Sequence, residues 1–491
     1  MSDIGGVDFN FSFAPGVLDE QILGFELAGD VWSQYLHDTY KGEDLDINLY
    51  VAVGDDILPD DVVGGAFPAI ETGINYRKIY RALKKDRTTE NDDIAFDSLL
   101  NKNKFDVLVG DNIVGKNKDM QATRANLKAL GLIKKKHLDQ LDGFIVMNSL
   151  VNAESVSWNY NYLEDPQEGE IDFLSVAMHE IGHNLGFFSG IDIYAWNEES
   201  TDYDGNKIDH MSPLDLFRYS AESFAVQDGN KTISINDITF GRAAYFSIDG
   251  TVDNAIAMST GADYQGSHWA NGDLETGTGL MNPTIRPGER WEISETDLKA
   301  FDVIGWDVKY DAVVNLEYLV ENAVTDLYKI DLEDLVDNDN DIDDDNDINL
   351  DALFSNNQFI IKDPCIVDRA DEVDEIFSGD AYKWAWRSTG ASGSGYWWAW
   401  RSTGASGSGY WWAWRSTGAS GSGYWSTYNT DALSTETSSN DNSDILGIDT
   451  NTCTNNNTTD NDSSILANNL DASLDEILET NKKEKKKKKK K

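Results

Sequence analysis

The segment from Met178 to Asp192, MHEIGHNLGFFSGID, restricts the fold of this chain more than any other part of its sequence. Its apolar side chains and those just before it share one face of a helix that turns 100° per residue: Leu174, Met178, Ile181 and Leu185. His179 and His183 fall together on the opposite side. The pattern therefore predicts a helix over 171–185 that buries one face in a core and presents two imidazoles to a cleft.

The spacing of these two histidines is typical of a metal site. Side chains four residues apart on a helix are neighbours, so both rings can reach one ion at about 2.0–2.1 Å. Glu180 lies 100° from His179, where it can reach a metal-bound water without binding the metal itself. Gly186 allows the chain to turn sharply once the helix has placed its ligands. The motif predicts a zinc site.

A catalytic zinc ion usually has three protein ligands and one open position. His37 and His137 precede the motif on helical or lysine-rich surface stretches, so we expect them to be solvated. His210 follows an acidic loop, and His268 lies in GSHWANGDLETGTGLMNPT, shortly before a turn at Met281. The residues alone leave both histidines open as the third ligand.

The charge of the chain argues against nucleic acid as a partner. The whole chain has a net charge of −47, although nine of its last ten residues are lysines; residues 1–481 alone carry −55. Such a body repels phosphate backbones. It suits a secreted or salt-exposed protein, or one that binds calcium.

Cysteine usage and hydropathy exclude other classes of protein. The two cysteines, Cys365 and Cys453, both follow residue 360, so neither a disulfide framework nor a cysteine zinc cluster is expected before it. The sequence contains no stretch of about 18 apolar residues, so no transmembrane segment is expected. The first residues, MSDIGGVDFNFSF, lack the features of a signal peptide. We expect a secreted, extracellular protein whose export uses another route or a leader missing from this sequence.

An ordered set of segments resembles a known family. These segments are HEIGHNLGFFSGID, SPLDLFRYS (212–220), YFSIDG (245–250), SHW (267–269), GLMNPT (279–284) and DLKAFDVIGWD (297–307). Together they are similar to the metzincin zinc peptidases. The match is closest to the leishmanolysin branch, in which a late SHW histidine precedes a methionine turn. The set also resembles secreted bacterial metalloproteases, both cyanobacterial ones and ones that bear sorting tails. The resemblance spans about residues 5–310.

The resemblance implies a zinc-dependent endopeptidase that acts on protein or peptide substrates. It implies three Zn²⁺ ligands, His179, His183 and His268. Glu180 would be the general base, and Met281 would be the methionine of the turn.

One position departs from the common metzincin pattern. Ser189 stands where most members place the third ligand. Asp192 follows the same turn and is an alternative third ligand, although a turn or capping role is favoured for it. His210 is the other alternative.

The expected fold is of the α/β (α+β) class, a metzincin-like domain with a mixed sheet and an active-site helix. Four parts are predicted: a catalytic domain (5–310), an acidic linker or helical region (311–383), three 14-residue Trp/Gly/Ser repeats (384–425), and a disordered polar segment with a lysine-rich tail (426–491).

Hydrophobic periodicity predicts several further elements of the catalytic domain. Alternation over Leu45–Val53 indicates a strand with one buried face, and 144–150 is predicted to be a buried strand with 155–162 as an antiparallel neighbour. Residues 119–130 are predicted to form a helix that ends at Gly131, and 295–308 a closing helix.

The C-terminal part permits two further interpretations. Residues 337–351 hold eight aspartates, which permits weak Ca²⁺ binding, but no register matches an EF-hand and a solvated acidic linker is favoured. The identical WAWRSTGASGSGYW repeats could stack tryptophans on a surface polysaccharide, or they are an unselected low-complexity tract. The alternative function is therefore a non-enzymatic, secreted protein that binds surfaces or carbohydrate through these repeats.

Overall fold

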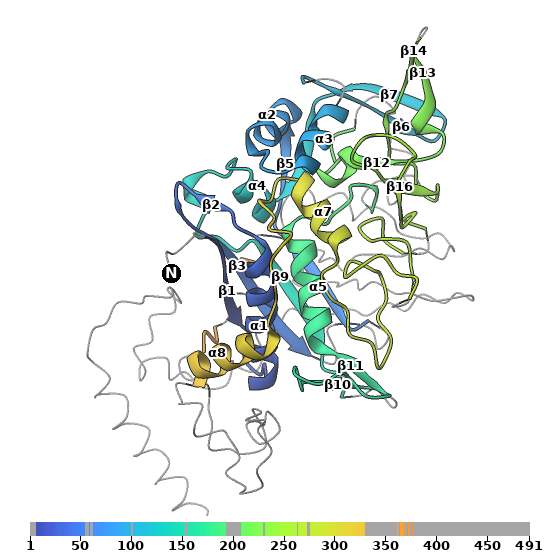
Figure 1. Ribbon diagram of the computed structural model, residues 1–491. Helices are drawn as coiled ribbons and strands as arrows, with labels where there is room; N and C mark the ends of the chain where they lie inside the picture. The colour runs from blue at the N-terminus through green and yellow to red at the C-terminus, as the bar shows by residue number, and fades with distance from the viewer. Residues whose placement is uncertain are drawn as a thin grey trace, which may run out of the picture. The chain divides into compact units, whose positions relative to one another are not determined.

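The computed structural model describes residues 6–328 and short stretches between 361 and 376 (Figure 1). Within the first range the gaps are 55–57, 59–61, 100–101, 152, 154–155, 193–207, 229–230, 263 and 273–274. All the described residues belong to one compact unit, Met1–Thr450. The aspartate run, the tryptophan repeats and the lysine tail lie outside the described residues, so the predictions about calcium and polysaccharide stay predictions.

A mixed sheet forms the base of the fold. Its strands are β1 (Val7–Phe13), β2 (Thr39–Tyr40), β3 (Glu43–Gly54), β4 (Gly64–Pro68) and β9 (Gly143–Asn148). The order is β1-β3-β9-β4, and β2 pairs with β3. β1, β3 and β9 run parallel, whereas β4 runs antiparallel to β9 at one edge.

The sequences of β3 and β9 explain their places in the sheet. In the first half of β3, Leu45, Ile47 and Leu49 are buried and alternate with more exposed polar residues, as the periodicity predicted. All six residues of β9, GFIVMN, are buried, which is typical of a central strand covered on both faces. The described residues thus form a mixed α/β fold.

Two helices lie side by side against this sheet (Figure 1). They are α1 (Asp19–Tyr35) and α5 (Phe173–Leu185), and α5 is the helix predicted over 171–185. The Trp32 indole of α1 donates a hydrogen bond of 3.0 Å to the Met178 carbonyl of α5. The rings of Phe25 and Phe173 meet edge to face, with centroids 5.6 Å apart. These contacts fix α5 between α1 and the edge strand β4.

The prediction of a helix over 119–130 was wrong for its first half. Residues Asp119–Thr123 form strand β8, which pairs antiparallel with β5 (Ile70–Asn75), and only Arg124–Ala129 form helix α4. The Thr123 side chain accepts a hydrogen bond from the Asn126 amide, so the helix begins there. A pairing partner about 50 residues upstream overrides the local helical pattern.

The predicted antiparallel partner of β9 was also wrong. Strand β10 (Ser157–Asn159) pairs in parallel with β11 (Glu170–Asp172), directly before α5. Its contact with the end of β9 is made by a side chain, since the Trp158 indole donates to the Asn148 carbonyl at 2.8 Å.

The remaining elements surround this framework. The helices are α2 (Tyr76–Asp86), α3 (Glu90–Ser98), α7 (Glu295–Val303) and α8 (Leu316–Tyr328), with 3-10 turns at Lys135–His137, Leu214–Phe217 and Ser223–Ala225. The small sheets are β15-β6-β7 (Asn236–Asp237, Phe105–Val109, Asn112–Asn117), β12-β16-β17 (Arg218–Tyr219, Ala244–Phe246, Ile256–Met258) and β13-β14 (Val226–Asp228, Lys231–Ile233). Helix α7 is the predicted closing helix. None of the helices described is both long and apolar enough to cross a membrane.

The core continues past residue 310, where the catalytic domain was predicted to end. Helix α8 packs on α1, and its Val320 and Val324 are fully buried. Further along, the backbone near Cys365 joins the edge of β1: the Phe13 amide donates to the Cys365 carbonyl at 2.8 Å, and the Val367 amide donates to the Phe13 carbonyl at 2.9 Å. The predicted boundary therefore lies within a shared core, between α7 and α8.

Candidate metal centre

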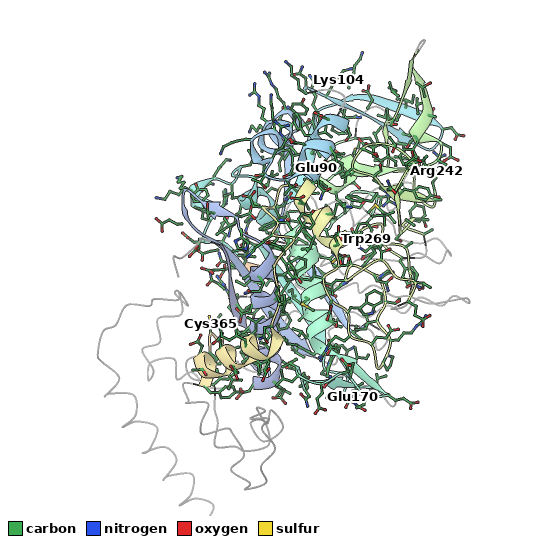
Figure 2. All side chains as sticks on the ribbon, in the orientation of Figure 1. Glu90, Lys104, Glu170, Arg242, Trp269 and Cys365 are labelled. Carbon is green, nitrogen blue, oxygen red and sulfur yellow. The ribbon has the colours of Figure 1, made fainter. Side chains whose placement is uncertain are left out.

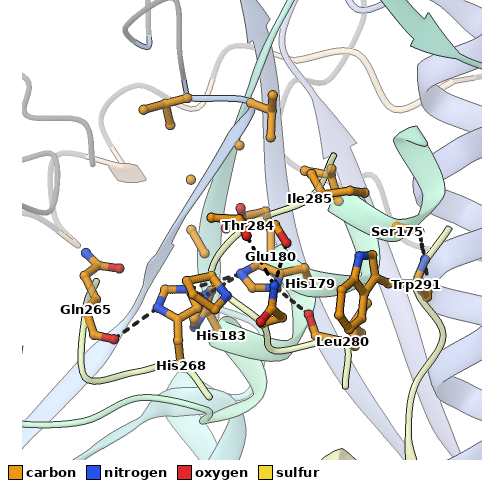
Figure 3. Close-up of a pocket in the computed structure, with 18 of the residues that line it drawn as sticks. Ser175, His179, Glu180, His183, Gln265, His268, Leu280, Thr284, Ile285 and Trp291 are labelled. Atoms are coloured by element: carbon orange, nitrogen blue, oxygen red, sulfur yellow. Dashed lines mark hydrogen bonds between the residues drawn. The ribbon is translucent and has the colours of Figure 1, made fainter. Parts of the chain in front are cut away.

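Three histidines from two distant parts of the chain converge at one point (Figure 3). The Nε2 atom of His183 lies 3.0 Å from that of His179 and 3.2 Å from that of His268, and the third separation is 3.3 Å. His179 and His183 come from α5, whereas His268 follows 85 residues later. Among the described residues, these three form the only group of His, Cys, Asp or Glu side chains close enough to hold a metal ion.

Backbone carbonyls fix the orientation of each ring. The Nδ1 atoms of His179 and His183 lie 2.8 Å from the carbonyls of Leu280 and Phe187, and that of His268 lies 3.3 Å from the carbonyl of Gln265. A carbonyl oxygen only accepts, so each Nδ1 must carry the proton. In the neutral ring, Nε2 then presents its lone pair to the point where the three meet.

Burial keeps these rings neutral. It lowers the pKa of His179 to about 4, with a small opposing effect from the bond to the Leu280 carbonyl. Burial also holds the pKa values of His183 and His268 well below the ordinary value, helped by repulsion between the neighbouring rings. At pH 7 all three therefore meet the first requirement of a metal ligand, which is the absence of a proton on the binding atom.

Local sequence explains why α5 starts and stops where it does. The Asp172 side chain accepts from the Ser175 amide and caps the N-terminus. At the C-terminus, Gly186 adopts φ = +124°, a conformation that strongly favours glycine. This turn sends the chain back, so that the Phe187 carbonyl reaches the His183 ring.

Met281 packs against α5 at Gly182, the residue before His183. Its side chain is fully buried, and a Cβ added at Gly182 would lie 2.6 Å from its sulfur. Glycine is therefore needed at position 182, where α5 contacts the Met281 side chain. The structure places Met281 directly against the segment that carries His179 and His183.

The carboxylate of Asp297, near the start of α7, holds the Met281 turn in place. It accepts hydrogen bonds from the amides of Leu280 and Met281 at 2.7 and 3.2 Å. It also accepts from the indole of Trp269, labelled in Figure 2, at 2.7 Å. One buried carboxylate therefore ties the turn to the residue that follows His268. Sequence reasoning missed this role, although DLKAFDVIGWD was among the segments that carried the resemblance.

Glu180 lies beside the three rings in the wall of the cleft (Figure 3). It is 6% exposed, and burial raises the pKa of its carboxyl to about 8. The edge strand β4 passes so close that a Cβ at Gly64 would lie 2.7 Å from a Glu180 carboxylate oxygen. Glycine at this position leaves room for the carboxylate.

The cleft has a volume of about 230 Å³ and runs between β4, α5 and the chain after Met281. Its walls are largely apolar, with a few amide and hydroxyl groups: Leu58, Val62, Val63, Phe67, Val176, Leu280, Ile285 and Trp291 beside Gln265, Asn282 and Thr284. Glu180 is the one carboxylate among the described lining residues, and none of those residues is Lys or Arg. The cleft is therefore mostly apolar apart from the three imidazoles, Glu180 and a few amide and hydroxyl groups.

The two alternative third ligands, Asp192 and His210, lie outside the group formed by His179, His183 and His268. Asp192 accepts hydrogen bonds from Gly266 and Ser267. The ring of His210 lies 3.2 Å from the Asp209 carboxylate, and its backbone carbonyl accepts from the Gln121 side chain. Neither residue is placed to complete a site with His179 and His183.

Comparison with known proteins adds no further constraint. No protein-family model, curated protein or solved structure matches this chain.

Proposed function

We propose that this protein is a zinc-dependent endopeptidase with a metzincin-like catalytic domain. The observation that carries the proposal is the convergence of the His179, His183 and His268 rings beside Glu180 in an apolar cleft. The position of Met281 against α5 supports the metzincin-like part of the proposal, because the sequence resemblance implied a methionine turn there.

The residues present fit a zinc ion. Three ligands of a tetrahedral ion bound at about 2.0–2.1 Å lie roughly 3.3–3.4 Å apart, and the three Nε2 atoms are separated by 3.0–3.3 Å. Neutral imidazoles suit zinc, and three protein ligands leave a position open for substrate or water. The bonds from Nδ1 to backbone carbonyls supply the outer support that histidine ligands need.

The chemistry divides between the metal and Glu180. A zinc ion held by the three histidines would lower the pKa of a coordinated water from 15.7 towards about 7 and would polarise a substrate carbonyl. Its positive charge would also lower the pKa of the nearby Glu180 carboxyl, which burial alone raises to about 8. The ionised Glu180 carboxylate then takes the proton from the attacking water and gives it to the departing amine. A general base of this kind contributes roughly 10²–10⁴-fold to the rate.

The edge strand β4 offers a way to hold the substrate backbone. β4 is an edge strand that pairs with β9, and its Gly64–Phe67 stretch lines the cleft. An extended peptide can add to such an edge through main-chain hydrogen bonds, which position it without regard to most of its side chains. This supports an endopeptidase that acts on extended or unfolded polypeptide.

The test combines zinc content with cleavage of an unfolded protein. The full chain should bind about one zinc per molecule, cleave the substrate, and lose that activity to a chelator. Glu180→Gln keeps the size of the side chain and should retain zinc while losing 10²–10⁴-fold in kcat/KM. Full activity in this variant would remove Glu180 from the mechanism. A wild-type chain that binds no zinc would refute the proposal.

A further inference from the structure

The third histidine lies on irregular chain, where its position needs outside support. His179 and His183 are fixed by α5, but the segment that precedes His268 consists of turns and bends. After His268 the chain is anchored, since the Ser259 amide donates to the His268 carbonyl and the Trp269 amide to the Met281 carbonyl, both at 3.0 Å. What holds the chain before His268 is a different set of contacts.

A single carboxylate contacts both residues immediately before His268. Asp192 accepts from the Gly266 amide at 2.5 Å through Oδ1. Through Oδ2 it accepts from the Ser267 amide at 3.2 Å and from the Ser267 hydroxyl at 2.6 Å. Three donors from two consecutive residues therefore meet one carboxylate, in a part of the molecule where Ser267 is fully buried.

The Ser267 hydroxyl links this carboxylate to the end of the active-site helix. It donates to Asp192 and accepts from the Ser189 amide at 2.8 Å. Ser189 stands at the place where most metzincins carry their third ligand. Here its amide supports the loop that delivers His268 from elsewhere in the chain.

Asp192 binds the amide of Gly266, and the buried guanidinium group of Arg218 binds its carbonyl. Arg218 is fully buried and donates to the Gly266 carbonyl at 3.2 Å and to the Ser259 carbonyl at 2.5 Å. Glycine is required between these contacts, because a Cβ at Gly266 would lie 2.0 Å from the Cγ2 atom of Ile191. The segment before His268 is thus held against the turn after α5 from two sides.

We propose that Asp192 is a positioning residue for the third metal ligand, which it holds in place by binding Gly266 and Ser267. This inference rests on the proposed zinc site and assigns a role in it to a residue that binds no metal. A ligand held in place before the metal arrives loses less conformational freedom on binding. Removing such a support typically weakens metal affinity by 10–100-fold.

The first experiment compares two isosteric substitutions in the full chain. Asp192→Asn leaves one acceptor oxygen where three donors converge, so zinc affinity measured by chelator competition should fall by about 10–100-fold. Asp237→Asn is the matched control. Asp237 is also a buried carboxylate near Arg218, but its hydrogen bonds go to Thr239 and Arg242. Its zinc affinity should stay within about twofold of wild type. Equal affinity in the two variants would overturn the inference.

A second comparison separates positioning from a general loss of structure. If Asp192 acts through His268, adding Asp192→Asn to a His268→Ala chain should cause little further loss of zinc affinity. The same 10–100-fold loss in both backgrounds would show that Asp192 affects the site by another path, and the inference would fail.

Hydrogen exchange of the zinc-free chain gives a readout that needs no metal. The amides of residues 264–269 should exchange faster in Asp192→Asn than in Asp237→Asn, and unchanged exchange would contradict the inference. If Asp192→Asn does not fold, Ser267→Ala carries the same test, because it removes the hydroxyl that links Asp192 to the Ser189 amide and keeps the two backbone amide bonds to Asp192. A wild-type chain without zinc refutes the proposed function, whereas a zinc-binding wild type with an unaffected Asp192 variant refutes only this inference.

Discussion

The Glu180 side chain occupies space that Gly64, in the opposite wall of the cleft, leaves open. A methyl group at Gly64 would press on the carboxylate at 2.7 Å and on the Val176 side chain at 2.9 Å. At the next residue, Gly65, the nearest atom to an added Cβ is 3.7 Å away, which is an ordinary contact. An added methyl group would therefore be crowded at Gly64 but not at Gly65.

Gly64→Ala should displace the Glu180 carboxylate and lower kcat/KM by about tenfold or more, since misplacement of a catalytic group by an ångström costs up to 10²-fold. Zinc content should not change, because no metal ligand is touched. Gly65→Ala is the matched control and should keep most of the activity. Equal rates in the two variants would show that the Gly64 contact does not limit the position of the carboxylate.

At the level of single residues, the i,i+4 spacing alone predicted that His179 and His183 lie together on one helix. The residues alone did not decide between His268 and His210 as the third ligand, and Asp192 was a further alternative once the family pattern was considered. The reason is distance along the chain: His268 lies 85 residues from His183, and no local pattern records that approach. The role proposed for Asp192 depends on contacts 74 and 75 residues away, so its type and its place in a turn could suggest only a local role.

Among the elements, the ends of α2, α3 and α7 bring several carboxylates together. Burial, together with repulsion from nearby carboxylates, raises the pKa of Asp86 to about 9 and that of Asp302 to about 7. Burial and repulsion from Asp307 also hold the pKa of Asp38 well above its ordinary range. The folded chain binds these protons more tightly than the unfolded chain does. This contribution to stability is therefore greatest at low pH and is lost as the pH rises towards 9.

The free energy of unfolding should accordingly fall between pH 5 and pH 9. Asp86→Asn removes a carboxyl whose pKa is about 9 in the folded chain and should stabilise the chain by about 1–2 kcal/mol at pH 8. Chemical denaturation at pH 5 and pH 8 tests this. The gain should shrink at pH 5, because protonating a carboxyl that is ionised in the unfolded chain costs less free energy at the lower pH. A variant that is less stable than wild type at pH 8 would contradict this account.

Sequence reasoning was most accurate for elements whose local pattern and tertiary environment agree. α5 and the first half of β3 are present as their periodicity predicted, because the apolar face of each meets the core. The prediction of one buried face was wrong for the second half of β3, where Tyr50 and Ala52 are buried as well. The error at 119–130 arose where the two disagree: an Asp119–Thr123 stretch with helical spacing pairs with β5 instead. A strand was predicted at the position of β10, but its partner and direction were wrong, because its neighbour in the sheet, β11, is only three residues long.

On the scale of the whole molecule, the described core extends beyond the catalytic domain predicted from the sequence. The resemblance ends near residue 310, yet α8 adds three fully buried side chains, Val320, Val324 and Tyr328. Burying a large apolar side chain contributes about 1.5–3 kcal/mol, and a domain is stable by only about 5–15 kcal/mol in total. The part of the chain after residue 310 is therefore expected to matter for folding.

A chain that ends at residue 310 should lose several kcal/mol of unfolding free energy relative to one that ends at residue 378. Denaturation midpoints of the two truncated chains provide the comparison. The longer chain keeps α8 and the contact of Cys365 with β1. Equal midpoints would mean that the catalytic domain is complete at residue 310, as the sequence predicted.

If His179, His183 and His268 bind one zinc ion, X-ray absorption at the zinc edge of the zinc-loaded full chain should reveal it, because imidazole ligands give a distinct scattering signal. We expect three imidazole nitrogens at about 2.0–2.1 Å in the wild type, and two in the His268→Ala chain. Two imidazoles in the wild type, with no change on removing His268, would contradict this expectation.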